Sequence, residues 1–233
     1  MSETYTHSGF DITIMQDDMV GSPRTEYDNM GKMICFHSRH NLGDEHSYNS
    51  PEEAMADILF DLGLDQFSDT DVDQIMDTMT GVKMMELLEE HAVVLPVYLY
   101  DHSGLTVSTT GFSCPWDSSQ VGIIYTTNKQ ARDEYKSDTL MQAREKARKY
   151  LVGEVETYDQ FLTGDVWGFR VERNGIELDS CWGFYGQKHC IDEATSIADW
   201  HADDRWKARL KKLKALIRQH VPFGKRKDIM SRM

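Results

Sequence analysis

The alternation of hydrophobic and polar residues predicts several short β-strands, most of them paired as hairpins. Apolar residues recur at every second position, or form short β-branched runs, in segments bounded by turn residues. These segments span residues 11–15, 32–36, 93–100, 105–110, 121–126, 166–172 and 176–181. The last two flank Asn174-Gly175, a strong hairpin signal, and Pro96 predicts a bulge or a sheet edge in its segment.

Three helices are predicted between the second and the third of these strands. The first covers residues 51–62, with Ser50 as its N-cap and Glu53 completing a capping box. A second short helix is expected from about residue 68, and a third from about residue 83 to residue 91. Together they form an acidic helical insertion at about residues 50–91.

Two further helices follow from apolar residues at helical spacing. One is long, at about residues 129–151, and the other runs from about residue 191 to residue 217 and becomes strongly basic. The mixture of hairpins and helices predicts an α+β fold with a mixed or antiparallel sheet. We expect residues 1–204 to form a single α+β domain and residues 205–233 to form a basic amphipathic C-terminal helix and tail.

Charged residues are unevenly distributed along the chain. The chain has 233 residues, with 39 acidic against 25 basic side chains and a formal charge of −14. Residues 1–120 carry 22 acidic and 4 basic side chains, whereas residues 205–233 carry 1 acidic and 11 basic side chains. The negative net charge disfavours general nucleic-acid binding, so direct nucleic-acid contact is expected only through the basic tail.

The acidic side chains are densest between Ser50 and Glu90, where twelve carboxylates accompany one lysine. Seven of them recur at four-residue intervals: Glu53, Asp57, Asp61, Asp65, Asp69, Asp73 and Asp77. They form either an ordinary solvated helix surface or a surface that presents spaced negative charge to a basic partner. A calcium loop is not expected, because Gln74 and Thr80 occupy the positions of its glycine and its glutamate.

No apolar run is long enough to cross a membrane, and the N-terminus lacks the pattern of a secretory leader. The four cysteines are sparse and have no CxxC spacing, which favours free thiols in a reducing compartment. We therefore expect a soluble, unsecreted protein.

Three polar loops hold the candidate chemistry. They are expected to converge at strand ends, and their candidate ligand residues are His37, Arg39, His40, Asp44, His46, Asp101, His102, Cys114, Trp116 and Asp117. The histidines and carboxylates suit a transition metal, but their spacing matches no standard template, so no metal and no cofactor is expected. A nucleophilic cysteine, a polar binding loop and ordinary turns remain the alternatives for these loops.

The basic segment at residues 205–218 places Trp206, Leu210, Leu213 and Ile217 at helical spacing and leaves the cations on the complementary face. Three partners fit this pattern: the chain's own acidic helices, an acidic protein or a nucleic acid.

Three stretches resemble a widespread family of uncharacterised phage and prophage proteins. They read SPRTEYDNMGKMICFHSRHNLGDEH (22–46), LPVYLYDHSGLTVSTTGFSCPWDSSQVGIIY (95–125) and GEVETYDQFLTGDVWGF (153–169). The resemblance implies a virus-encoded accessory protein in the host cytoplasm, and it supplies no catalytic residues.

Charge and resemblance together predict a protein that acts by binding. We expect it to inhibit a host nucleic-acid-directed defence system, of the restriction or CRISPR type, through its acidic surface. The expected partner is a host protein, such as a nucleic-acid-binding defence component, and no membrane. The alternative is a nucleotide- or nucleic-acid-directed enzyme or ligand-binding protein that uses the loops at 37–46, 101–102 and 112–120.

Overall fold

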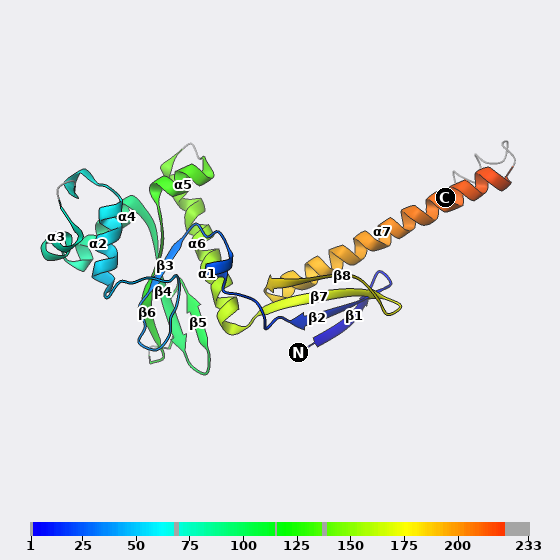
Figure 1. Cartoon of the computed structure of the whole chain (residues 1–233), viewed down its shortest axis with the longest axis horizontal. Helices are drawn as coiled ribbons and strands as arrows, with labels where there is room; N and C mark the ends of the chain where they lie inside the picture. Colours follow the sequence, from blue (N-terminus) through cyan, green and yellow to red (C-terminus); the bar gives the residue numbers. More distant parts are fainter. Residues whose placement is uncertain (1, 68–69, 115, 137–138, 222–233) are drawn as a thin grey trace. The chain divides into compact units, whose positions relative to one another are not determined.

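The computed structural model has an α+β fold with two antiparallel sheets (Figure 1). It describes residues 2–67, 70–114, 116–136 and 139–221. By its internal contacts the chain divides into a central unit, residues 21–164, and a terminal unit, residues 1–20 with 165–233. This division differs from the expected boundary at residue 204, because one continuous helix passes through that position.

The central unit is built on a four-stranded antiparallel sheet. Its strand order is β3 (Lys32–Cys35), β6 (Ser118–Thr127), β4 (Ala92–Asp101) and β5 (Leu105–Ser108). The prediction of a bulge near Pro96 is confirmed, since the pairing of β4 with β6 shifts between Val97 and Tyr98.

Helices cover both faces of this sheet, and each face has its own hydrophobic core. Alternate residues of β4 explain the division: Val93 and Val97 pack with Leu151 of α6 (Leu140–Thr163), whereas Val94 packs with the acidic helices. Leu59 and Leu88 are fully buried in the second core. Figure 1 shows these two layers on either side of the sheet.

The acidic insertion forms four short helical segments: α2 (Pro51–Asp61), the 3₁₀ turn η1 (Asp65–Phe67), α3 (Val72–Thr78) and α4 (Gly81–His91). Ser50 caps α2 as predicted, and its hydroxyl accepts the backbone N–H of Glu53. The Glu53 carboxylate accepts the backbone N–H of Asn49 at 2.7 Å. The hydrogen bonds that this carboxylate accepts from Asn49 lower the pKa of Glu53 and tie the incoming loop to the helix.

The prediction of one long helix at residues 129–151 is wrong. α5 (Asn128–Tyr135) is terminated by the C-cap Lys136, which adopts a left-handed conformation. α6 begins after the N-cap Thr139. α6 then continues to Thr163 and ends at Gly164 with φ of 71°, a common helix stop. A short helix, α1 (Pro23–Glu26), precedes β3.

The terminal unit contains a second sheet, in which the N-terminal strands pair with strands from residues 166–185. Its order is β1 (Ser2–His7), β2 (Phe10–Gln16), β7 (Val166–Arg173) and β8 (Ile176–Tyr185). The predicted hairpin at Asn174-Gly175 is confirmed, and both of its turn residues have positive φ. β1 was not predicted, because it alternates only weakly and is largely exposed.

One face of this second sheet is covered by α7 (Gln187–His220), which begins earlier than predicted. The small residues Cys190, Ala194 and Ala198 are fully buried and allow close packing on Phe10 and Phe169. In Figure 1 the second half of α7 extends past the ends of these strands.

Within the described residues, no helix has the combination of length and apolarity needed to cross a bilayer.

Candidate functional site

A buried ion cluster holds the first polar loop of the central unit in place. Arg24 donates to both Asp44 oxygens, at 2.8 and 2.9 Å, and to Glu154 Oε2 at 2.7 Å. Burial lowers the pKa of Arg24, but the hydrogen bonds and charges of the two carboxylates outweigh burial and raise it above its usual value. Arg24 is therefore a permanent cation that links α1, the loop after β3, and α6.

The two carboxylates of this cluster also bind backbone groups. Glu154 accepts the N–H groups of Met30 and Gly31, and Asp44 accepts that of Met33 at 2.7 Å. No polar side chain in the cluster is left unpaired, which is the condition under which a buried ion pair is tolerated. Asp44, predicted as a ligand residue, lines the pocket beside this loop and is held in place by these hydrogen bonds.

The neighbouring loop closes against α6 at Gly43. Its backbone N–H donates to the Tyr158 hydroxyl at 3.1 Å, and its φ is +74°. A Cβ atom at this position would lie 2.6 Å from the Met33 carbonyl oxygen, so only glycine fits. This contact fixes the path of the loop between β3 and α2.

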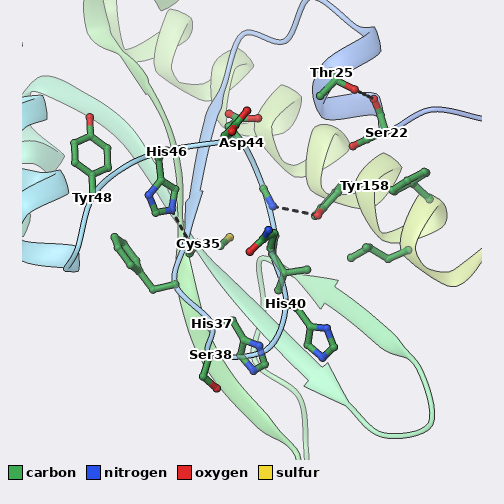
Figure 2. Close-up of a pocket in the computed structure, with 17 residues that line it drawn as sticks. Ser22, Thr25, Cys35, His37, Ser38, His40, Asp44, His46, Tyr48 and Tyr158 are labelled. Atoms are coloured by element: carbon green, nitrogen blue, oxygen red, sulfur yellow. Dashed lines mark hydrogen bonds between the residues drawn. The ribbon is translucent and has the colours of Figure 1, made fainter.

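A cavity of about 900 Å³ lies along this loop (Figure 2). Its wall combines aromatic, imidazole and hydroxyl side chains, which include Phe36, His37, His40, His46, Tyr48 and Tyr158. Cys35 also lines it, but burial raises the pKa of this thiol to about 12, so it is a protonated, weak nucleophile at neutral pH.

The three histidines of the loop have different surroundings. His37 and His40 stack with their ring centroids 5.1 Å apart. His46 packs on Phe36, and its Nε2 lies 2.9 Å from the Cys35 carbonyl oxygen, to which it donates. His46 Nδ1 is buried and has no hydrogen-bond partner among the described residues.

The three polar loops meet at one end of the central sheet, as the strand ends predicted. Arg39 pairs with Asp101 at 2.5 Å, and His40 lies 3.6 Å from the same carboxylate. His102 Nδ1 lies 3.4 Å from Asp117 Oδ2. These pairs join the loop after β3 to the β4–β5 turn, and that turn to the loop before β6.

The geometry of these pairs does not match a nucleophilic cysteine site. Cys114 Sγ lies 3.7 Å from Asp117 Oδ2, the same oxygen that faces His102, so the neighbour of the thiol is an anionic carboxylate, which disfavours a thiolate, and not an imidazole. Trp116 is 93 % exposed. In the described part of the chain, no group of three or more histidine, cysteine or acidic side chains is placed to hold a metal ion.

The predicted acidic residues are spread over separate segments instead of one ridge. Glu53, Asp57 and Asp61 lie on α2, Asp65 lies in η1, Asp73 and Asp77 lie on α3, and Asp69 falls outside the described residues. Two of them have internal roles, because Glu53 caps the loop before α2 and Asp57 accepts the Tyr48 hydroxyl at 2.5 Å. The four-residue spacing therefore does not align these side chains along one continuous helix.

The acidic helices nevertheless carry a large uncompensated charge. Eight carboxylates on or beside α2, α3 and α4 are exposed: Glu52, Asp61, Asp71, Asp73, Asp77, Glu86, Glu89 and Glu90. None of the ion pairs found among the described residues involves any of these eight. The only cation between residues 50 and 90 is the exposed Lys83.

A groove of about 520 Å³ runs between α3 and α4 in the layer formed by α2, α3 and α4, which we call the acidic layer. Apolar residues, including Phe67, Ile75 and Leu87, line it together with the carboxylates Glu86 and Glu90 and the cation Lys83. The groove thus offers apolar contact and one more carboxylate than cation, which suits a partner side chain with an apolar stem and a cationic end.

Sequence reasoning missed Arg24, Glu154 and Tyr158 as the residues that hold the candidate loop. Arg24 and Glu154 are 130 positions apart along the chain, so no local spacing pairs them. The only available signal was that all three lie within the stretches that carry the family resemblance.

Comparisons of this chain with protein-family models, curated proteins and solved structures found no significant match.

Proposed function

We propose that this protein acts by binding a basic partner protein through the exposed carboxylates of α2, α3 and α4. The observation that carries the proposal is the set of eight exposed carboxylates with no ion pair among the described residues. Like charges held on packed helices repel each other, so this arrangement costs stability unless a partner compensates it.

The groove between α3 and α4 favours binding of a protein partner rather than compensation of the charge by dissolved cations. Its apolar floor adds area that leaves water on binding, and Glu86 and Glu90 supply charge beside it. Arginine and lysine side chains that normally contact a phosphate backbone meet both requirements. A nucleic-acid-binding protein is therefore the class of partner that fits.

The context comes from the resemblance to phage proteins. A phage accessory protein that occupies the basic groove of a nucleic-acid-directed defence component, of the restriction or CRISPR type, would protect the phage genome in the host cytoplasm. The ion pairs that bind the polar loops together support a structural role for those loops in this function.

Affinity purification from phage-infected host cells tests the proposal. Three exposed carboxylates, Asp61, Asp73 and Asp77, are changed to Asn, which removes charge without adding bulk. The control changes Glu177, Asp192 and Glu193, which are exposed on the terminal unit, to their amides. We expect the wild-type chain and the control to capture the same nucleic-acid-binding protein, and the acidic-layer variant to lose it.

Capture should also fall steeply as salt rises, because salt screens the attraction between exposed opposite charges. The proposal is overturned if every captured protein is retained by the acidic-layer variant.

A further inference from the structure

The outer half of α7, residues 205–220, has a composition unlike the rest of the described chain. It holds seven basic side chains and no acidic one. Lys207 pairs with Asp203 at 2.6 Å, and the Arg205 guanidinium lies over the Phe10 ring. None of the ion pairs among the described residues involves the other five cations: Arg209, Lys211, Lys212, Lys214 and Arg218.

Apolar residues accompany these cations along one side of the helix. Trp206, Leu210 and Leu213 follow one another at intervals of four and three residues, the spacing of a coiled-coil seam. Trp206 is 55 % exposed and Leu213 is 43 % exposed, whereas Leu210 is half-buried and Ile217, the next residue of the series, is buried. The core of the terminal unit uses Cys190, Ala194 and Ala198 from the first half of the helix instead.

Exposed cations beside exposed apolar side chains distinguish a nucleic-acid partner from a helical protein partner. A phosphate backbone would neutralise the cations but would leave Trp206 and Leu213 in water, since phosphates offer no apolar surface. A helix with its own apolar seam would bury both side chains and gain contact area. The exposed seam therefore favours a helical protein partner.

The flanking charges define the sign of that partner. If Leu210 is assigned to position a of a heptad, Arg209 falls at position g and Lys214 at position e, the positions that face the partner's flanks. Two copies of this helix would set cation against cation in either orientation, which disfavours self-pairing. A partner helix with glutamate or aspartate at its flanks would reverse each of these interactions.

We infer that the outer half of α7 is a docking element for an acidic amphipathic helix of another protein. It is a different surface from the acidic layer proposed above, because it belongs to the terminal unit. The partner helix carries leucine-like residues along one seam and carboxylates on both sides of it.

Two synthetic peptides of about three heptads test the inference with the full-length protein. Both have leucine at positions a and d; one has glutamate and the other lysine at positions e and g. We expect the glutamate peptide to bind and the lysine peptide to fail, as measured by fluorescence anisotropy.

Variants separate a docking seam from general charge attraction. Arg209→Glu with Lys214→Glu should weaken binding of the glutamate peptide about tenfold and should admit the lysine peptide. The control, Lys211→Glu with Arg218→Glu, makes the same charge change away from the seam and should leave both affinities within about threefold. Leu213→Asn should weaken the glutamate peptide in either background, and circular dichroism checks that each variant keeps its helix content.

Three results would overturn the inference. The first is an equal loss of binding in the two charge variants, which would mean nonspecific attraction. The second is tighter binding of a DNA duplex of about 20 base pairs than of the glutamate peptide. The third is self-association of the protein alone that Leu213→Asn abolishes.

Discussion

Replacing Glu154 by glutamine tests whether the buried ion cluster holds the central unit together. Glu154 Oε2 accepts from Arg24 Nη1 at 2.7 Å, and its Oε1 accepts two backbone N–H groups. Glutamine keeps one acceptor oxygen for those backbone groups. Its amide group, however, presents a donor to Arg24, which is itself a donor, and the negative charge is lost.

The expected cost follows from the burial of the pair. The Arg24 side chain is 2 % exposed and that of Glu154 is 6 % exposed, so water cannot replace the lost partner. Removing one partner of a buried ion pair costs about 3–5 kcal/mol. Because Asp44 keeps two hydrogen bonds to Arg24, we expect a loss at the low end, about 3 kcal/mol in the free energy of unfolding.

Amide hydrogen exchange of α6, followed by mass spectrometry, measures this loss within the central unit. It avoids assuming that both units of the chain unfold in one step. The control is Glu156→Gln, an exposed glutamate two residues farther along the same helix. If Glu154→Gln and Glu156→Gln differ by less than about 0.5 kcal/mol, the cluster does not have the structural role described above.

Three further predictions concern thiols, tyrosine ionisation and helix packing. Burial raises the pKa of Cys35 to about 12 and that of Cys190 to about 11, so a thiol reagent at pH 8 should label exposed Cys181 in the native protein and these two only after unfolding, as mapped by mass spectrometry. Burial also raises the pKa of Tyr125 to about 12; since the unfolded chain then loses this proton first, the unfolding free energy should fall above about pH 10, and a Tyr125→Phe variant should show a smaller fall in alkaline denaturation. Ala198→Leu should overfill the contact of α7 with its sheet and cost about 1–3 kcal/mol in urea denaturation, and an unchanged midpoint would contradict that packing.

Elements with strong local signals could be predicted from the sequence. The Asn174-Gly175 hairpin and the start of α2 at Pro51 both depend on residues within a few positions of each other. The prediction of one long helix at residues 129–151 was wrong, also for a local reason. Apolar residues continue at helical spacing across Lys136, but this residue adopts a left-handed conformation and ends α5. The spacing of apolar residues does not reveal such a conformation.

The candidate site was only partly predictable. The three polar loops follow strand ends, so their meeting at one end of the sheet could be expected, and the pairs Arg39–Asp101 and His102–Asp117 show it. The partners of Asp44 could not be expected, because Arg24 and Glu154 reach it from distant segments. The spacing of the acidic residues was visible, but the breaks between α2 and α3 separate them.

Phage plating measures whether the exposed carboxylates of the acidic layer engage a defence component in cells. Phage are plated on cells that carry a defined restriction or CRISPR system and express one of three chains. These are the wild type, the Asp61, Asp73 and Asp77 to Asn variant, or the charge-matched control on the terminal unit. We expect the wild type and the control to restore plating and the acidic-layer variant to fail to do so. Equal protection by all three chains would contradict this expectation.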